Sequence, residues 1–311
     1  MRSSATLVAA VLAFAAFALP ADAKTSAANP YRRSPYVGAL SVDASSGRTL
    51  FADRANVPAY PASVTKLMTA YLVLDDVSAG RLRLDEAVVA SRPATREDEW
   101  LRQPSCTGLP VGASMTVDEL LTALMVNSAN DAAMFLAEKC SGSVAAFVGR
   151  MNEKARELGM ASTVYYNPNG LPPWTGAKVR KFNVSTCRDL ARLACALLDN
   201  HPEILKYTSI KVWSATAMGR PMRDAHGGQI KKVNHNNVMV KNRLKVLNPD
   251  GSEAADGLKT GYIDAGGSSL ILTGSRGGRR AIVIVLGSAT AQERDERAKF
   301  LLEDALDSFT L

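Results

Sequence analysis

Apolar residues recur at two different spacings along this chain of 311 residues, strand-like near both ends and helical between them. Apolar runs bounded by polar, Gly-containing turns predict strands at 36–42, 48–52, 257–263, 268–274 and 281–287. The links between the last three runs have hairpin length, so we expect those strands to pair antiparallel. Together the five runs predict a single antiparallel sheet.

Helical spacing dominates residues 84–200, with segments at 151–158 and 189–198, and returns in an amphipathic closing segment at 291–309. Thr116-Val117-Asp118-Glu119 is a capping-box sequence that predicts a helix start. The predicted fold is therefore α/β (α+β), a five-stranded antiparallel sheet covered by helices. We expect the stretch from about 84 to 200 to form an inserted all-helical subdomain.

The first residues have the pattern of a secretion signal. Arg2 precedes an apolar run at 9–19, and Ala21-Asp22-Ala23 fits the small-x-small cleavage rule. This predicts a signal peptide at 1–23 and an exported domain at 24–311, in the periplasm or cell-wall space. No later run approaches the roughly 20 apolar residues of a membrane span. We therefore expect no integral membrane segment after signal cleavage.

Charge and cysteine content narrow the classes of partner. The formal net charge is +7, but no block of Lys and Arg or basic-aromatic stripe predicts nucleic-acid binding. Cys187 and Cys195 lie about 12 Å apart along a predicted helix, too far to pair. We expect Cys106 to pair with Cys140, although sequence alone permits three connectivities. The cysteine spacing matches no zinc pattern, and we predict no cofactor.

Three short motifs carry the candidate chemistry, and each occurs once: Ser63-Val64-Thr65-Lys66, Ser128-Ala129-Asn130 and Lys259-Thr260-Gly261. In a helix, the hydroxyl of Ser63 and the amine of Lys66 would lie side by side, one turn apart. Ser128 and Asn130 fall between two predicted helices, and the third motif begins an apolar strand. The motifs thus predict a cleft between helices and sheet.

A serine hydroxyl needs a base to become a nucleophile, and the sequence offers a lysine for this role. The chain has no Ser-His-Asp pattern, and we expect solvated or structural roles for its three histidines, His201, His226 and His235. Lys66 can act as the base if burial and a nearby cation such as Lys259 keep part of its amine neutral.

In their order and placement, the motifs resemble those of penicillin-binding D-alanyl-D-alanine carboxypeptidases, low-molecular-mass serine peptidases that act on peptidoglycan. Residues 61–71 resemble the family's nucleophile segment, 256–262 its strand motif and 167–171 one of its loops. The resemblance covers about residues 35–310 and implies a β-lactamase/transpeptidase-like fold. Many relatives carry a further β-rich domain and a C-terminal membrane anchor, and the sequence predicts neither here.

The resemblance implies four catalytic residues. Ser63 attacks the carbonyl between two terminal D-alanines, and Lys66 takes its proton. Ser128 relays a proton towards the leaving amine, while Asn130 orients the substrate.

Five further residues are implied to bind substrate. Lys259 and Thr260 meet the terminal carboxylate, and Gly261 lets the backbone approach closely. Backbone N–H groups of Ser63 and Tyr262 form the oxyanion hole. Arg294 matches the position of a carboxylate-binding arginine, although a helix-surface arginine fits the same pattern.

The function implied is removal of the terminal D-alanine from peptidoglycan stem pentapeptides through an acyl-enzyme on Ser63. The partners are then peptidoglycan stem peptides, with β-lactam antibiotics as covalent inhibitors. The close alternative is a D,D-endopeptidase that cuts peptidoglycan cross-links. We disfavour a β-lactamase because the sequence shows no convincing Glu-containing loop that could activate a water molecule for deacylation. A non-catalytic wall-binding protein would have no need for Lys66 beside Ser63.

Overall fold

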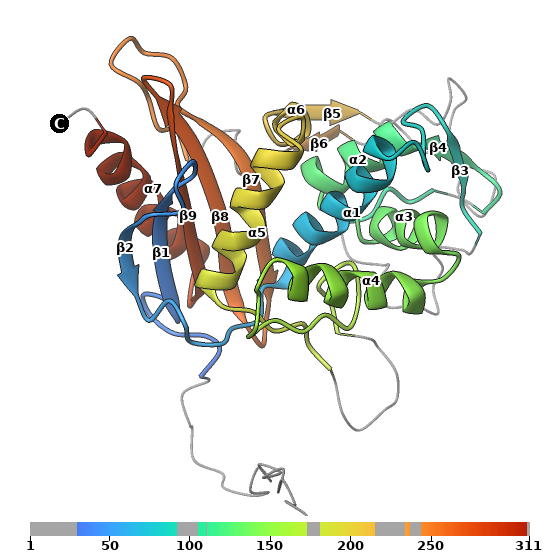
Figure 1. The fold of residues 1–311 in the computed structure, drawn as a ribbon, viewed down its shortest axis with the longest axis horizontal. Coiled ribbons are helices and arrows are strands. Elements are labelled where there is room, and N and C mark those ends of the chain that lie inside the picture. The colour runs from blue at the N-terminus through green and yellow to red at the C-terminus, as the bar shows by residue number, and fades with distance from the viewer. Residues whose placement is uncertain are drawn as a thin grey trace, which may run out of the picture.

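A five-stranded antiparallel sheet forms one side of the molecule, and a lobe of helices forms the other (Figure 1). The computed structural model describes residues 30–91, 105–109, 111–172, 181–214, 234–236 and 244–309, with only the backbone of 214 and 234–236. The predicted signal peptide and His226 lie outside this range. The sheet has the order β2-β1-β9-β8-β7, where the strands are β1 (Gly38–Asp43), β2 (Thr49–Asp53), β7 (Ala255–Ile263), β8 (Gly267–Arg276) and β9 (Arg279–Ser288).

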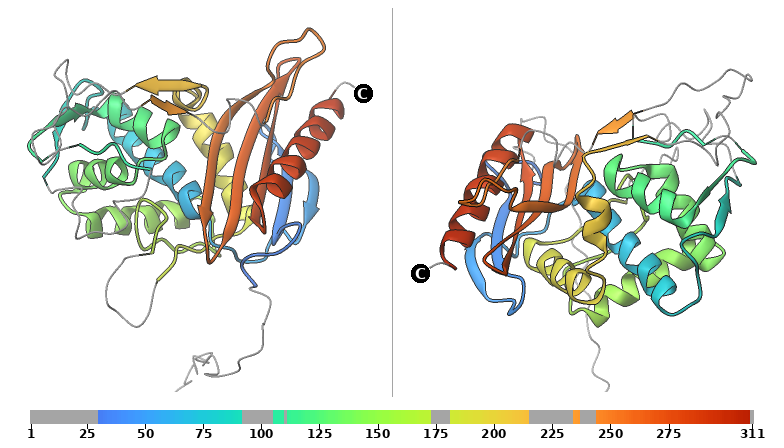
Figure 2. Two further views of the ribbon diagram at one scale, coloured as in Figure 1. Left: turned by 180° about the vertical axis from the view of Figure 1, so that it is seen from behind. Right: turned by 90° about the horizontal axis from the view of Figure 1, so that it is seen from above.

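Helices cover both faces of the sheet (Figure 2). The closing helix α7 (Ala291–Asp307) packs on one face, and α5 (Cys187–Asn200) packs on the other. The lobe beyond α5 contains α1 (Lys66–Ser78), α2 (Val117–Val126), α3 (Asn130–Ser141), α4 (Val144–Glu157) and the short α6 (Ile204–Thr208). In the part of the chain that the structure describes, no helix combines the length and apolarity needed to cross a bilayer.

Two small antiparallel ribbons complete the described fold. One pairs β3 (Ala87–Val89) with β4 (Ser114–Thr116), and the other pairs β5 (Val212–Ser214) with β6 (Asn234–Asn236). The first ribbon leads directly into α2, because Thr116 caps that helix.

Two apolar cores follow from this layering. The smaller lies between the sheet and α7, where Leu301, Leu302 and Leu306 are buried against Val283 and Val285. The larger fills the space between the opposite sheet face, α5 and the helical lobe. The central strand β9 is buried almost throughout, as expected for a strand covered on both faces.

The predicted fold class is confirmed, since all five predicted strands occur in a single antiparallel sheet. Each strand begins within about two residues of its predicted start. The predicted capping box is also present. The hydroxyl of Thr116 accepts from the backbone N–H of Glu119 at 3.2 Å, and Glu119 Oε2 accepts from the Thr116 N–H at 2.8 Å. The extent of an inserted helical subdomain stays a prediction.

The expected Cys106–Cys140 disulfide is wrong. All four cysteines lie in the described part of the chain and all are free. Cys106 lies beside the start of α3, where its carbonyl accepts from Asn127 Nδ2 at 2.9 Å, whereas Cys140 is almost at the end of that helix. Ten helical residues separate these ends by about 15 Å, far beyond disulfide reach. Burial raises the pKa of each thiol, so all four stay protonated near neutral pH.

Candidate active site

The nucleophile candidate lies on a tight turn between the sheet and the helical lobe. Residues Ala62–Thr65 form a 3-10 turn, η1, that runs directly into α1. Ser63 is therefore just ahead of the α-helix, and Lys66 is the first residue of that helix. The turn begins with Ala62 at φ +50°, a left-handed conformation that non-glycine residues seldom adopt. Ser63 remains partly accessible, whereas Lys66 is completely buried.

The side chain of Lys66 joins three parts of the site. Its Nζ lies 2.9 Å from Ser63 Oγ, 2.8 Å from Asn130 Oδ1 and 2.7 Å from the backbone carbonyl oxygen of Asn169. The two amide oxygens can only accept hydrogen bonds. A neutral amine has two hydrogens to donate to them, and its lone pair is then left for the Ser63 hydroxyl. In this arrangement a neutral Lys66 could accept a proton from Ser63.

Burial also favours the neutral amine that this arrangement needs. Desolvation lowers the pKa of Lys66 well below its ordinary value of 10.5, and the nearby positive charge of Lys259 lowers it further. Lys259 is itself buried, and desolvation together with the charge of Arg294 lowers its pKa to about 7. Lys259 and Arg294 therefore lie near Lys66 in a poorly hydrated region, where their positive charges favour an anionic ligand.

The second motif occupies the connection between α2 and α3. Ser128 has φ +58°, and its Oγ is buried with no hydrogen-bond partner among the described residues. Asn130 is the first residue of α3, and its N–H donates to the Ser105 carbonyl at 2.8 Å. A serine in the left-handed backbone conformation costs of order 1 kcal/mol. The surrounding structure must offset this cost to hold the Ser128 hydroxyl in its position.

The third motif lies on β7, which forms one edge of the sheet. A Cβ added at Gly261 would lie 2.5 Å from the Pro61 carbonyl oxygen and 3.1 Å from the backbone N of Ser63. Only glycine therefore lets the strand lie this close to the nucleophile turn. Thr260 is partly exposed beside it, and the side chain of Tyr262 is turned to solvent, with its hydroxyl donating to Asp264 at 2.7 Å. The close approach brings the backbone of Tyr262 alongside the start of η1.

Arg294 lies in the same region, although it belongs to α7. The residue is 5% exposed, so the alternative of a helix-surface arginine does not describe it. Its Nε and Nη2 donate to Asp295 Oδ1 at 2.7 and 2.6 Å, and its charge acts on the pKa of Lys259. The structure thus brings Lys66 into contact with Ser63 and Asn130, and it brings Gly261 against the turn that carries Ser63. Arg294 is near enough to Lys259 for its charge to lower the pKa of that lysine.

Three groups that contact the predicted site residues or their neighbours were not predicted from the sequence. The Asn169 carbonyl contacts Lys66, Asn183 connects the Asn169 loop to Thr65, and Asp295 pairs with Arg294. The loop at 167–171 carried a signal through its resemblance to a family loop. A backbone carbonyl and a lone asparagine carry no motif, so Asn183 could not have been found from the sequence.

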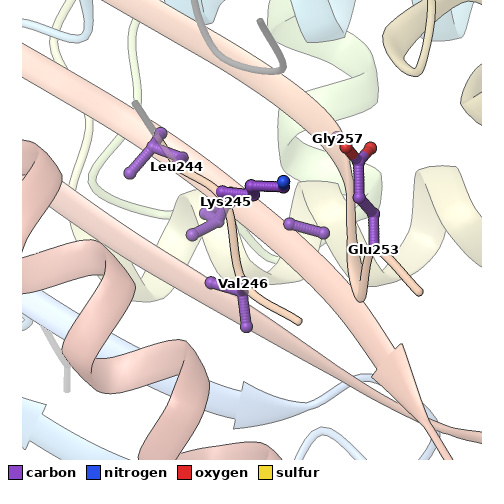
Figure 3. Close-up of a pocket in the computed structure, with 7 residues that line it drawn as sticks. Leu244, Lys245, Val246, Glu253 and Gly257 are labelled. Atoms are coloured by element: carbon purple, nitrogen blue, oxygen red, sulfur yellow. The ribbon is translucent and has the colours of Figure 1, made fainter. Parts of the chain in front are cut away.

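A small pocket lies at the start of β7, lined by Lys245, Glu253, Ala255 and Gly257 (Figure 3). Lys245 and Glu253 stand on opposite sides of it, and the carboxylate of Glu253 already accepts from Lys211 at 2.7 Å. None of the nine candidate residues lines this pocket, which is why we do not assign the chemistry to it.

A serine with a lysine base, opposite a Ser-x-Asn connection and a Lys-Thr-Gly strand, defines a class of serine acyl-transfer site that includes penicillin-binding proteins. Residues 37–290 match the model of the S11 peptidase family, described as D-alanyl-D-alanine carboxypeptidase. The chain belongs to this family.

Individual relatives and solved structures agree with the family match. The chain is 31% identical over 271 residues to the D-alanyl-D-alanine carboxypeptidase DacF of Bacillus subtilis, covering 87% of this chain and 62% of DacF. A D-alanyl-D-alanine endopeptidase of Pseudomonas aeruginosa is 34% identical over 178 residues, covering 57% of this chain and 50% of the relative. The chain thus spans less than two thirds of the length of either relative. The crystal structure of penicillin-binding protein D2 from Listeria monocytogenes, with cefotaxime bound, superposes with a TM-score of 0.68 at 30% identity, covering 87% of this chain and 96% of that one.

Proposed function

We propose that this protein is a serine D,D-carboxypeptidase that removes the terminal D-alanine from peptidoglycan stem pentapeptides. The observation that carries the proposal is the set of contacts around Lys66, whose amine lies 2.9 Å from Ser63 Oγ and is oriented by Asn130 Oδ1 and the Asn169 carbonyl. A buried lysine held in this way has no evident purpose in a binding module, and it supplies the base that a serine nucleophile needs.

In the proposed reaction, Ser63 Oγ bonds to the carbonyl carbon between the last two D-alanines while its proton passes to Lys66 Nζ. Backbone N–H groups of Ser63 and Tyr262 stabilise the resulting oxyanion. The C–N bond then breaks, and a proton relayed through Ser128 reaches the leaving amine of D-alanine. Water hydrolyses the Ser63 ester and returns the enzyme to its starting state. The buried hydroxyl of Ser128 has no hydrogen-bond partner among the described residues, which suits a relay because a substrate amine can become its partner.

The cations of the cleft supply recognition of the substrate's terminal carboxylate. Lys259 and Arg294 lie close enough for the charge of one to lower the pKa of the other, which a bound carboxylate would relieve. Thr260 follows Lys259 on β7, and we expect its hydroxyl to bind the same carboxylate. Asn130 keeps its oxygen towards Lys66, so its amide NH2 points elsewhere and is available to orient the peptide.

The partners and location follow from the same proposal. Peptidoglycan stem peptides are the substrates, and β-lactams acylate Ser63 as covalent inhibitors, in line with the β-lactam bound to penicillin-binding protein D2. An enzyme of this kind acts outside the inner membrane, in the periplasm or cell-wall space. Export is the role that we assign to the predicted signal peptide at 1–23.

Labelling with a fluorescent penicillin tests the acyl-enzyme. We expect the purified protein to become covalently labelled, the label to disappear in Ser63→Ala, and labelling to become much slower in Lys66→Ala. A Ser63→Ala protein that is folded and still labelled would refute the assignment of the nucleophile.

A D,D-endopeptidase is the second candidate, favoured by the similarity to the Pseudomonas aeruginosa endopeptidase. Chromatography of muropeptides after incubation with the enzyme separates the two functions. A carboxypeptidase converts pentapeptides to tetrapeptides and leaves cross-linked dimers intact, whereas an endopeptidase converts dimers to monomers. Loss of dimers alone would replace our first proposal by the second.

A further inference from the structure

Asn183 is a buried polar residue whose amide makes hydrogen bonds on every side. It is 2% exposed and lies shortly before α5. Its Oδ1 accepts from the backbone N–H groups of Tyr166 at 2.7 Å and Asn167 at 3.2 Å. Its Nδ2 donates to Thr65 Oγ1 and to the Asn167 carbonyl, both at 3.0 Å. The two acceptor sites and two hydrogens of the amide are thus all used.

These bonds connect the two structures that hold the proposed base. Thr65 lies between Ser63 and Lys66 in the chain, and its backbone belongs to the nucleophile turn. Asn167 begins the loop whose Asn169 carbonyl accepts from Lys66 Nζ at 2.7 Å. Asn183 is therefore hydrogen-bonded to Thr65, the residue before Lys66 in the chain. It is also hydrogen-bonded to Asn167, which lies two residues before Asn169.

The loop itself is braced so that a shift at Asn167 is passed on to Asn169. Asn167 Oδ1 accepts from the Gly170 N–H, and Asn167 Nδ2 donates to the Leu171 carbonyl, each at 2.6 Å. On the far side, Thr69 Oγ1 donates to the Pro168 carbonyl at 2.7 Å. Gly170 lies directly against the backbone of η1, because a Cβ there would overlap the Ala62 carbonyl at 1.9 Å. The loop and the nucleophile turn thus form one packed unit.

We infer that Asn183 is a positioning residue for acyl transfer, which fixes the Asn169 carbonyl and the Thr65 segment relative to each other and so aims the Lys66 amine at Ser63. The inference rests on the proposed function of Ser63 and Lys66. Asn183 is buried behind the nucleophile turn and is not placed to touch the substrate. Its loss is therefore expected to slow the reaction of Ser63 without removing any group that contacts the substrate.

Asn152 provides a matched control for a purely structural effect. It lies in α4, where its Oδ1 accepts from the Tyr165 N–H at 2.8 Å. Its Nδ2 donates to the carbonyls of Tyr165 at 2.8 Å and Val148 at 3.0 Å. Asn152 thus anchors the same segment shortly before the loop, with a similar number of hydrogen bonds and no bond to the nucleophile turn.

The test compares Asn183→Ala with Asn152→Ala by thermal unfolding and by the second-order rate constant of acylation by fluorescent penicillin. We expect both variants to lower the unfolding midpoint to a similar degree. Acylation is expected to fall about 100-fold in Asn183→Ala, because small misplacements of a reacting group cost this much, and about threefold or less in Asn152→Ala. Equal losses of acylation in the two variants, or a wild-type rate in Asn183→Ala, would overturn the inference.

A second pair of variants covers the case in which Asn183→Ala does not fold. Thr65→Val keeps the shape of the side chain but removes the acceptor for Asn183 Nδ2, whereas Thr65→Ser keeps the hydroxyl. We expect Thr65→Val to acylate slowly and Thr65→Ser to retain nearly the wild-type rate. Equal rates in the two variants would count against the inference. Failure of the wild type to label would instead refute the proposed function, so the two failures are distinguishable.

Discussion

The acylation rate is predicted to fall as the pH rises above about 7, because Lys259 then loses the charge that binds the ligand's carboxylate. Lys66 and Lys259 have opposite requirements. Lys66 must be neutral to accept the Ser63 proton, so its deprotonation makes the rate rise on the acid side. Lys259 must be protonated to attract an anion, so its deprotonation makes the rate fall on the alkaline side. The expected profile is a bell.

The burial of Lys259 determines the pH at which the rate begins to fall. Desolvation and the charge of Arg294 lower the Lys259 pKa from 10.5 to about 7, equivalent to roughly 5 kcal/mol of less favourable charging at about 1.4 kcal/mol per pH unit. The protonated fraction of Lys259 falls tenfold for each unit above its pKa. The second-order rate constant for a carboxylate ligand is therefore expected to fall about tenfold per pH unit, since it reports the free enzyme.

The assay measures acylation by fluorescent penicillin between about pH 5 and pH 10, in the wild type and in Lys259→Arg. An arginine keeps its charge over this range, so the alkaline limb is expected to disappear from the variant even if its overall rate is lower. A decline that persists unchanged in Lys259→Arg would show that another group causes it. A wild-type rate that keeps rising to the alkaline end would refute the role of Lys259.

Two further changes test the packing and the charge of the site. In Gly261→Ala, the new Cβ meets the Pro61 carbonyl at 2.5 Å, so we expect a loss of about 1–3 kcal/mol in the free energy of unfolding and much slower penicillin labelling. Gly149→Ala is the control, because the site in α4 is open and the change is expected to add up to about 1 kcal/mol by helix propensity; similar unfolding midpoints for the two variants would contradict the packing argument. Asp295→Asn removes the buried counter-charge of Arg294, so the pKa of Lys259 is expected to fall further and the alkaline limb to move to lower pH. An alkaline limb at the wild-type position would show that Asp295 does not act on Lys259.

The sequence predicted the architecture well where a periodic pattern extended over a whole element. The runs that became β8 and β9 and the closing helix α7 are long and apolar on the buried side, so their type and order followed from the pattern. Boundaries were less certain. Residues 144–150 belong to α4 although the predicted segment began at 151. Val144, Phe147 and Val148 extend the helical apolar spacing back from Met151, so the pattern would have supported the earlier start.

The candidate site, like the fold, could be predicted only in part. The sequence motifs identified Ser63, Lys66 and Asn130 by the chemistry and spacing of their side chains. The structure shows the contacts among these three residues, while their catalytic roles stay predictions. Groups that act through the backbone or through a single distant side chain left no pattern, as for the Asn169 carbonyl and Asn183. The disulfide expectation failed for a related reason, since cysteine count and compartment say nothing about which end of α3 each thiol occupies.

The pairing of β1 with β9 has a consequence for when activity can appear during folding. Gly38 pairs with Leu286, nearly 250 residues later, and the Gly261 strand must pack against the turn that carries Ser63. Contacts of such long range form late, because closing so large a loop costs entropy before any contact repays it. The nucleophile, although it lies in the first quarter of the chain, stays without its opposite wall until the last strands have joined the sheet. We therefore expect penicillin labelling to report completed folding as well as the chemistry of Ser63.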